Sequence, residues 1–187
     1  MALDRLAVVS HRMAALSLGF VIVMLALNAA VWLFPQLSSM EGGSGLAFYL
    51  SDQMISMPGL DLTTYPLWQK LGAILLSSIP LLMLTVGLLN LRALFKNYAT
   101  GDYFSPSSSA CMEKMGRAVA AWVALNIVCE PLLSLWLTMR EPAGQRLLSL
   151  SFDSAGAVAL FLAACIIVIA RILRRASEIN DENQQFV

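Results

Sequence analysis

Leu67–Leu91, LWQKLGAILLSSIPLLMLTVGLLNL, is a long and predominantly apolar stretch in which Lys70 is the one charged residue. A membrane-spanning helix needs about 20 consecutive, predominantly apolar residues, and this stretch meets that requirement. Three more stretches are long and apolar enough to span a membrane, with approximate ends Met13–Phe34, Gly116–Leu137 and Ala155–Ile172. The sequence therefore predicts four transmembrane helices.

Composition supports a chain whose solvent is the lipid bilayer. Of its 187 residues 58% are hydrophobic and 13% are charged, and the mean hydropathy is +0.72. A soluble domain carries about a quarter charged residues, so this chain has too little polar material to cover a globule. The formal net charge is +0, which gives no basic field for direct binding of nucleic acid.

We expect neither a metal nor a cofactor. The three cysteines, Cys111, Cys129 and Cys165, are widely spaced and form no CxxC pair, and His11 is the one histidine. Zinc and redox sites need closer groupings of such ligands. No phosphate-binding loop or nucleophile elbow is present either, so we expect a protein that is not an enzyme.

The predicted fold class is all-α: a single integral membrane domain, residues 1–187, whose residues 173–187 form a helical tail. The first span has a longer apolar core than a signal peptide and no clean cleavage site, so it is retained as a span. Nine of the 12 Lys and Arg residues lie in the N-terminal segment, the connection between the second and third spans, and the tail. Positive residues favour the cytoplasmic side, which predicts cytoplasmic N- and C-termini and a multi-pass protein of the bacterial inner membrane.

The outer segment between the first two spans, residues 35–66, contains the apolar run LAFYLSDQMISM. It is consistent with a lid over the bundle, or with an amphipathic helix that lies on the membrane or binds a partner.

The cytoplasmic connection LFKNYATGDYFSPSSSACMEKMGR predicts a tight helical hairpin. The second helix should continue to about Tyr98, and Gly101 suits a left-handed C-cap. Ser105 followed by Pro106 is typical of an N-cap and first helical residue. The hairpin and partner-binding candidates are Tyr98, Gly101, Tyr103 and Phe104.

The tail RILRRASEINDENQQFV starts basic and ends with acidic and amide residues. Its arginines suit anionic lipid headgroups. At helical spacing Ile172, Ala176 and Ile179 share a stripe with Asn183, which fits either a solvated helix end or a docking helix.

The hairpin and the tail resemble a bacterial membrane family called domain of unknown function 2975. The resemblance rests on the hairpin residues Leu94, Phe95, Tyr98, Gly101 and Phe104, on the run EPLLSL, and on the terminal residues Glu182, Asn183, Phe186 and Val187. It covers about the last two-thirds of the chain. The resemblance implies a four-helix inner-membrane protein without an established activity, and the occurrence of some members beside small helix-turn-helix regulators implies membrane-linked regulation.

Glu130 is a carboxyl residue inside the third span, directly followed by Pro131. Counting from Arg117 at about 1.5 Å per residue puts it roughly 20 Å into the membrane, at a depth similar to that of Asn28, Ser77 and Ser78. A carboxyl there costs on the order of 3 kcal/mol.

Three arrangements would offset that cost. In the first, Glu130 is hydrogen-bonded in a polar intramembrane cluster with Asn28, Ser77 and Ser78. In the second, it lines a polar cavity that binds a cation, a proton or a small ligand. Alternatively the span is shifted and the carboxyl lies at the outer interface beside Arg140.

The leading functional hypothesis is an accessory or sensory component that engages a cytoplasmic regulatory protein through its hairpin and tail. The alternative is a small transporter or channel-like protein that binds a cation or small ligand near Glu130. Four helices enclose little volume, so the alternative would require a homo-oligomer. A third hypothesis is a plain bundle that supports membrane homeostasis.

Overall fold

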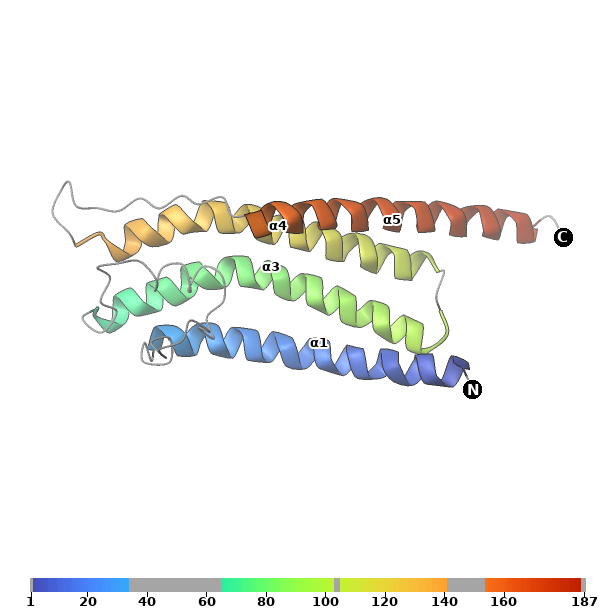
Figure 1. Ribbon diagram of the computed structural model, residues 1–187, viewed down its shortest axis with the longest axis horizontal. Helices are drawn as coiled ribbons and strands as arrows, with labels where there is room; N and C mark the ends of the chain where they lie inside the picture. The colour runs from blue at the N-terminus through green and yellow to red at the C-terminus, as the bar shows by residue number, and fades with distance from the viewer. Residues whose placement is uncertain (1, 34–64, 103–104, 141–153, 186–187) are drawn as a thin grey trace. The chain divides into compact units, whose positions relative to one another are not determined.

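The computed structural model describes residues 2–33, 65–102, 105–140 and 154–185, and the side chains of all these except 2–6 and 180–185. These residues form four α-helices and no strand (Figure 1). The helices are α1 (Ala2–Leu33), α3 (Leu67–Ala99), α4 (Pro106–Leu137) and α5 (Ser154–Gln185). The all-α expectation is confirmed, while the segment 35–64 lies outside the described residues.

Each helix contains a stretch that is long and apolar enough to cross a membrane. These stretches are Ala7–Leu33, Leu67–Ala99, Pro106–Leu137 and Ser154–Ile179. A helix of 32 residues is about 48 Å long, against about 30 Å for the hydrocarbon core, so each helix continues past the lipid. The helices are longer than the predicted spans because hydropathy marks the apolar part alone, whereas the helical backbone continues through polar residues.

The end of α3 and the start of α4 have the predicted caps. Gly101 has a φ of 84°, the left-handed conformation that a glycine adopts without steric cost. Its backbone N–H donates to the carbonyl of Tyr98, and that of Asp102 donates to the carbonyl of Asn97, which together form a Schellman motif. At the start of α4 the backbone N–H of Ser108 donates to Oγ of Ser105 at 3.2 Å.

The described residues divide into two compact units. The first contains 2–21, 83–102, 105–123 and 154–185, and the second contains 22–33, 65–82 and 124–140. We call them the tail unit and the Glu130 unit. The core of the Glu130 unit is formed by Trp32, Ala73, Cys129, Leu133 and Leu137.

In the tail unit, α4 and α5 approach closely where small residues meet. A Cβ added at Gly116 would lie 2.7 Å from Cγ1 of Ile167 and 3.1 Å from the carbonyl oxygen of Ala163. Ala163 and Ala170 are fully buried. Small residues allow this approach between transmembrane helices.

Candidate functional site

Asn28 and two serines form a buried polar cluster in the Glu130 unit. The side-chain amide of Asn28 in α1 donates to Oγ of Ser77 at 3.1 Å and to Oγ of Ser78 at 3.2 Å, both in α3. Each serine hydroxyl in turn donates to the carbonyl of Ile74, at 3.2 and 2.6 Å. Both serine hydroxyls therefore donate a hydrogen bond within α3 and accept one from the side-chain amide of Asn28 in α1.

Glu130 lies in α4 within the same unit, and its side chain is 1% exposed. Its neighbours in sequence include the buried core residues Cys129 and Leu133. Pro131 follows inside the continuous helix and supplies no N–H to the carbonyl of Ile127. A buried carboxyl beside a weakened turn of helix is typical of a polar cluster or of a cation site in a membrane protein.

A second polar contact in the Glu130 unit joins α3 to α4 and was not anticipated from the sequence. The side-chain amide of Gln69, which is fully buried, donates to the carbonyls of Trp136 and Leu137 at 3.1 and 2.8 Å. In return the indole N–H of Trp136 donates to the backbone carbonyl of Gln69 at 3.0 Å. Gly72 lies one turn further along α3, against the indole ring of Trp136.

Aromatic contacts extend this junction. The rings of Trp68 and Trp136 meet edge to face with centroids 5.8 Å apart, and the guanidinium carbon of Arg140 lies 5.7 Å from the centroid of Trp68. Edge-to-face and cation–π pairs are favourable geometries for these groups. The only sequence signal for the junction is a glutamine and a tryptophan in otherwise apolar helices.

The hairpin in the tail unit is held by a network centred on the buried side chain of Ser108. Its hydroxyl donates to the carbonyl of Asp102 at 3.0 Å and accepts from the side-chain amide of Asn97 at 3.2 Å and from Ser105 at 3.3 Å. Such a network joins the end of α3 to the start of α4. Tyr98 and Gly101 lie at the end of this turn, whereas Tyr103 and Phe104 lie outside the described residues.

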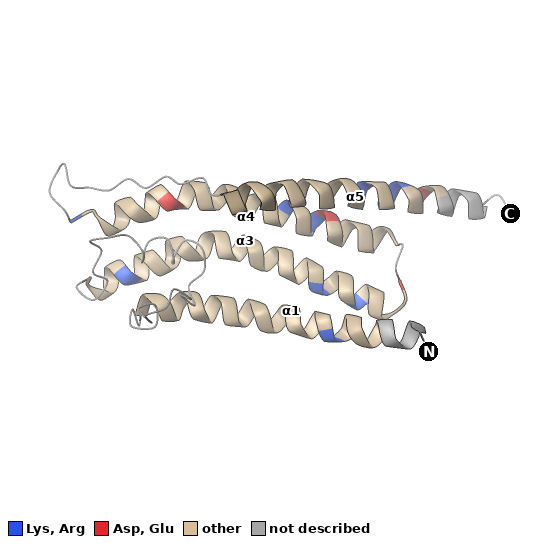
Figure 2. Cartoon of the chain, in the orientation of Figure 1, with Lys and Arg blue, Asp and Glu red and all other residues tan. Residues whose placement is uncertain are grey.

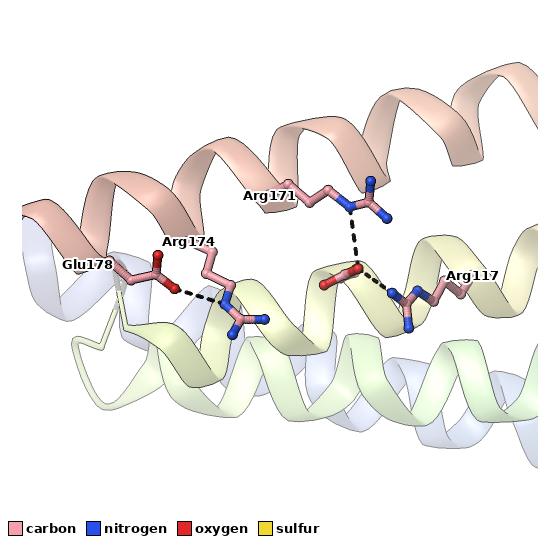
Figure 3. A network of polar contacts seen from close by, with 5 residues as sticks. Arg117, Arg171, Arg174 and Glu178 are labelled. Atoms are coloured by element: carbon pink, nitrogen blue, oxygen red, sulfur yellow. Dashed lines mark hydrogen bonds and ion pairs between the residues drawn. The ribbon is translucent and has the colours of Figure 1, made fainter.

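Glu113 links α4 to α5 in the tail unit, and sequence reasoning missed this role. Its carboxylate accepts from Arg117 at 2.6 Å and lies 3.5 Å from Nε of Arg171 in α5 (Figure 3). The Glu113 side chain is 14% exposed, while Arg117 and Arg171 are more than half exposed. The i,i+4 spacing to Arg117 was visible in the sequence, but the contact with Arg171 depends on how the helices pack.

The C-terminal part of α5 presents an exposed apolar face among its charges. Figure 2 shows the charged residues of α5 gathered toward its C-terminal end. Val168, Ile172 and Ile179 are each more than half exposed. The proposed tail residues Glu182 and Asn183 belong to α5, but their side chains, and Phe186 and Val187 entirely, lie outside the described residues.

The described residues contain no group of three or more His, Cys, Asp or Glu side chains placed to hold a metal ion. The three cysteines are free thiols.

Four apolar helices of spanning length, with polar contacts buried between them, define a multi-pass helical membrane protein. Residues 53–187 match the family described as Protein of unknown function (DUF2975). The chain belongs to this family, and the match contains α3, α4 and α5 entirely while α1 precedes it. No curated protein and no solved structure matches the chain.

Proposed function

We propose that this chain is an accessory or sensory component of the bacterial inner membrane, without enzymatic activity, that binds a cytoplasmic partner protein through the end of α5 and the adjoining hairpin. Both termini face the cytoplasm in this proposal. Support for that orientation comes from the predominance of Lys and Arg in the N-terminal segment, the hairpin and the tail. Within the tail unit, the end of α3, the start of α4 and the C-terminal end of α5 lie at one end (Figure 1).

The observation that carries the proposal is the exposure of Ile179 in a helix that is longer than the hydrocarbon core is thick. Ile179 follows Arg171 by two turns, roughly 12 Å along the axis. Arg171, Arg174 and Arg175 are typical of the headgroup level, which would put Ile179, the last residue of the candidate span Ser154–Ile179, on the cytoplasmic side of the headgroups. Its side chain is nevertheless 54% exposed. An isoleucine presented to water on a preformed helix is typical of helix-in-groove recognition, in which apolar anchors at helical spacing enter a partner.

The hairpin supports the same proposal because it is a rigid neighbour. The Schellman motif at Gly101 ends α3, and the Ser108 network ties that end to the start of α4, so ordering these described residues on binding would cost little entropy. The joined ends of α3 and α4, together with the C-terminal end of α5, are suited to a composite docking surface.

The experiment is a purification of tagged full-length protein from mild detergent, followed by mass spectrometry of what it retains. We expect removal of Glu178–Val187, or the single change Ile179→Asp, to reduce the retained cytoplasmic partner at least about tenfold, because the change puts a charge at an apolar anchor.

Glu178→Gln is the matched control, since Glu178 is also exposed on α5 but its contact is the ion pair with Arg174. It should retain the partner. Equal retention by Ile179→Asp and Glu178→Gln would contradict docking through the apolar face.

A second candidate function is favoured by the burial of Glu130. In this alternative the chain is a small transporter or channel-like protein, assembled as a homo-oligomer, in which Glu130 binds a cation, a proton or a small ligand. Its support is a carboxyl that is 1% exposed in a membrane-spanning helix, a placement typical of ion and proton pathways.

A further inference from the structure

One side of α5 forms a shallow groove of about 590 Å³ in which two arginines border apolar side chains. The groove is lined by Val168, Arg171, Ile172, Arg175, Ala176 and Ile179. Arg171 and Arg175 are one turn apart, so their guanidinium groups project from the same face of the helix. The small side chain of Ala176 lies between the two isoleucines in sequence and leaves the hollow between them.

The charges of the three arginines on α5 are not equivalent. Arg174 lies 3.1 Å from the carboxylate of Glu178 and is neutralised by it (Figure 3). Arg171 contacts Glu113, but that single carboxylate also accepts from Arg117, so the three groups together keep one positive charge. Arg175 has no carboxylate within ion-pair distance among the described residues. Among the described residues the groove therefore keeps a net positive charge.

Glu113 also fixes the direction of Arg171. The carboxylate lies 3.5 Å from Nε, the guanidinium nitrogen nearest the helix, which leaves the terminal Nη groups for another acceptor. Figure 3 shows the terminal nitrogens of Arg171 beyond the contact with the carboxylate. A guanidinium held in this way is preorganised for a phosphate, which accepts hydrogen bonds from two donors at once.

On the N-terminal side of the arginines, α5 presents an exposed apolar face. Val168, Phe161 and Val158 follow one another at helical spacing, and each is more than half exposed. They belong to the candidate span Ser154–Ile179, in which exposed apolar side chains contact acyl chains. The junction thus offers cations at the level of phosphates and an apolar track at the level of acyl chains.

We infer that this groove binds one anionic phospholipid, with its phosphate between Arg171 and Arg175 and an acyl chain along Val168 and Phe161. Under the proposed orientation the lipid belongs to the inner leaflet. The surplus positive charge selects an anionic lipid over a zwitterionic one. The site goes beyond partner docking and does not depend on it, because the proposed lipid contacts are Arg171, Arg175, Val168 and Phe161, and Ile179 alone is shared with the proposed docking surface.

The test is native mass spectrometry of the purified protein equilibrated with equal amounts of phosphatidylglycerol and phosphatidylcholine of the same acyl chains. We expect the wild type to retain phosphatidylglycerol about tenfold more. Arg175→Gln, which removes no ion pair of the described residues, should lower this preference at least threefold, and Arg171→Gln with Arg175→Gln should abolish it. Arg174→Gln is the control of equal charge change and should keep the preference.

Soluble glycerol 3-phosphate in the same experiment distinguishes a lipid from a free phosphate, and it should leave the bound phosphatidylglycerol in place. Equal retention of the two lipids by the wild type, or an unchanged preference in the double variant, would overturn the inference. An equal loss in Arg174→Gln would reduce the effect to general charge and overturn it too. Displacement by glycerol 3-phosphate, or loss of partner capture in Arg175→Gln with the lipid preference intact, would assign the arginines to another ligand.

Discussion

Gly72→Ala is expected to lower the thermal unfolding midpoint of the detergent-solubilised protein by roughly 10 °C. A Cβ at position 72 would overlap the indole ring of Trp136, a bulky group held in place by its hydrogen bond to the carbonyl of Gln69. Overpacking of this kind costs about 1–3 kcal/mol, and breaking the Gln69–Trp136 contacts adds on the order of 1 kcal/mol. The measurement is the unfolding midpoint, followed by intrinsic fluorescence.

Gly19→Ala is the matched control, because a Cβ at Gly19 would meet nothing within 4 Å. It should leave the midpoint unchanged or raise it slightly, since alanine is the better helix former. In a Trp136→Leu background the Gly72→Ala change should cost much less, because the overlapping ring is gone. Equal midpoints for Gly72→Ala and Gly19→Ala would show that α3 and α4 do not approach at this point.

Glu130→Leu is expected to have the second large effect on the unfolding midpoint, and the direction of the change tells whether the carboxyl stabilises the fold. Leucine removes a buried carboxyl whose insertion costs on the order of 3 kcal/mol, so a carboxyl without a role would give a more stable protein on replacement. If Glu130 stabilises a polar cluster, Glu130→Leu should instead lower the unfolding midpoint by several degrees. Glu130→Gln keeps the shape and the hydrogen-bonding groups and should stay close to the wild type.

The same pair of variants separates the structural role from ion binding. If Glu130 binds a cation, Na⁺ or K⁺ at high concentration should raise the midpoint of the wild type and have no effect on Glu130→Gln. An equal effect of salt on both proteins would exclude a cation at Glu130. A higher midpoint for Glu130→Leu than for the wild type would contradict the polar cluster.

Features encoded locally could be predicted from the sequence. The four spans follow from apolar runs, and the hairpin follows from Gly101 and Ser105, whose cap chemistry depends on neighbouring residues alone. The similar depth of Glu130, Asn28, Ser77 and Ser78 predicts one polar cluster, because polar groups in lipid must find one another. The structure joins Asn28 to both serines, and the place of Glu130 in the cluster stays a prediction. Residues separated by one loop and placed at one depth are therefore within reach of sequence reasoning.

Features that depend on which helix faces meet could not be predicted. Gln69 and Trp136 lie in different helices, and nothing local indicates that they exchange hydrogen bonds. Glu113 has a visible i,i+4 partner in Arg117, yet its contact with Arg171 requires the packing of α4 against α5 at Gly116. The positive charge of the arginine groove likewise depends on helix packing, because Glu113 of α4 contacts Arg171 while Glu178 pairs with Arg174.

The central claim, that the end of α5 contacts a partner protein in the cytoplasm, is tested most directly by photo-crosslinking in living cells. A photoreactive amino acid at Ile179, 54% exposed, is compared with one at Phe161, 69% exposed within the apolar span. The account predicts a discrete protein adduct from position 179 and none of the same mass from position 161. Lipid adducts alone from both positions would contradict it.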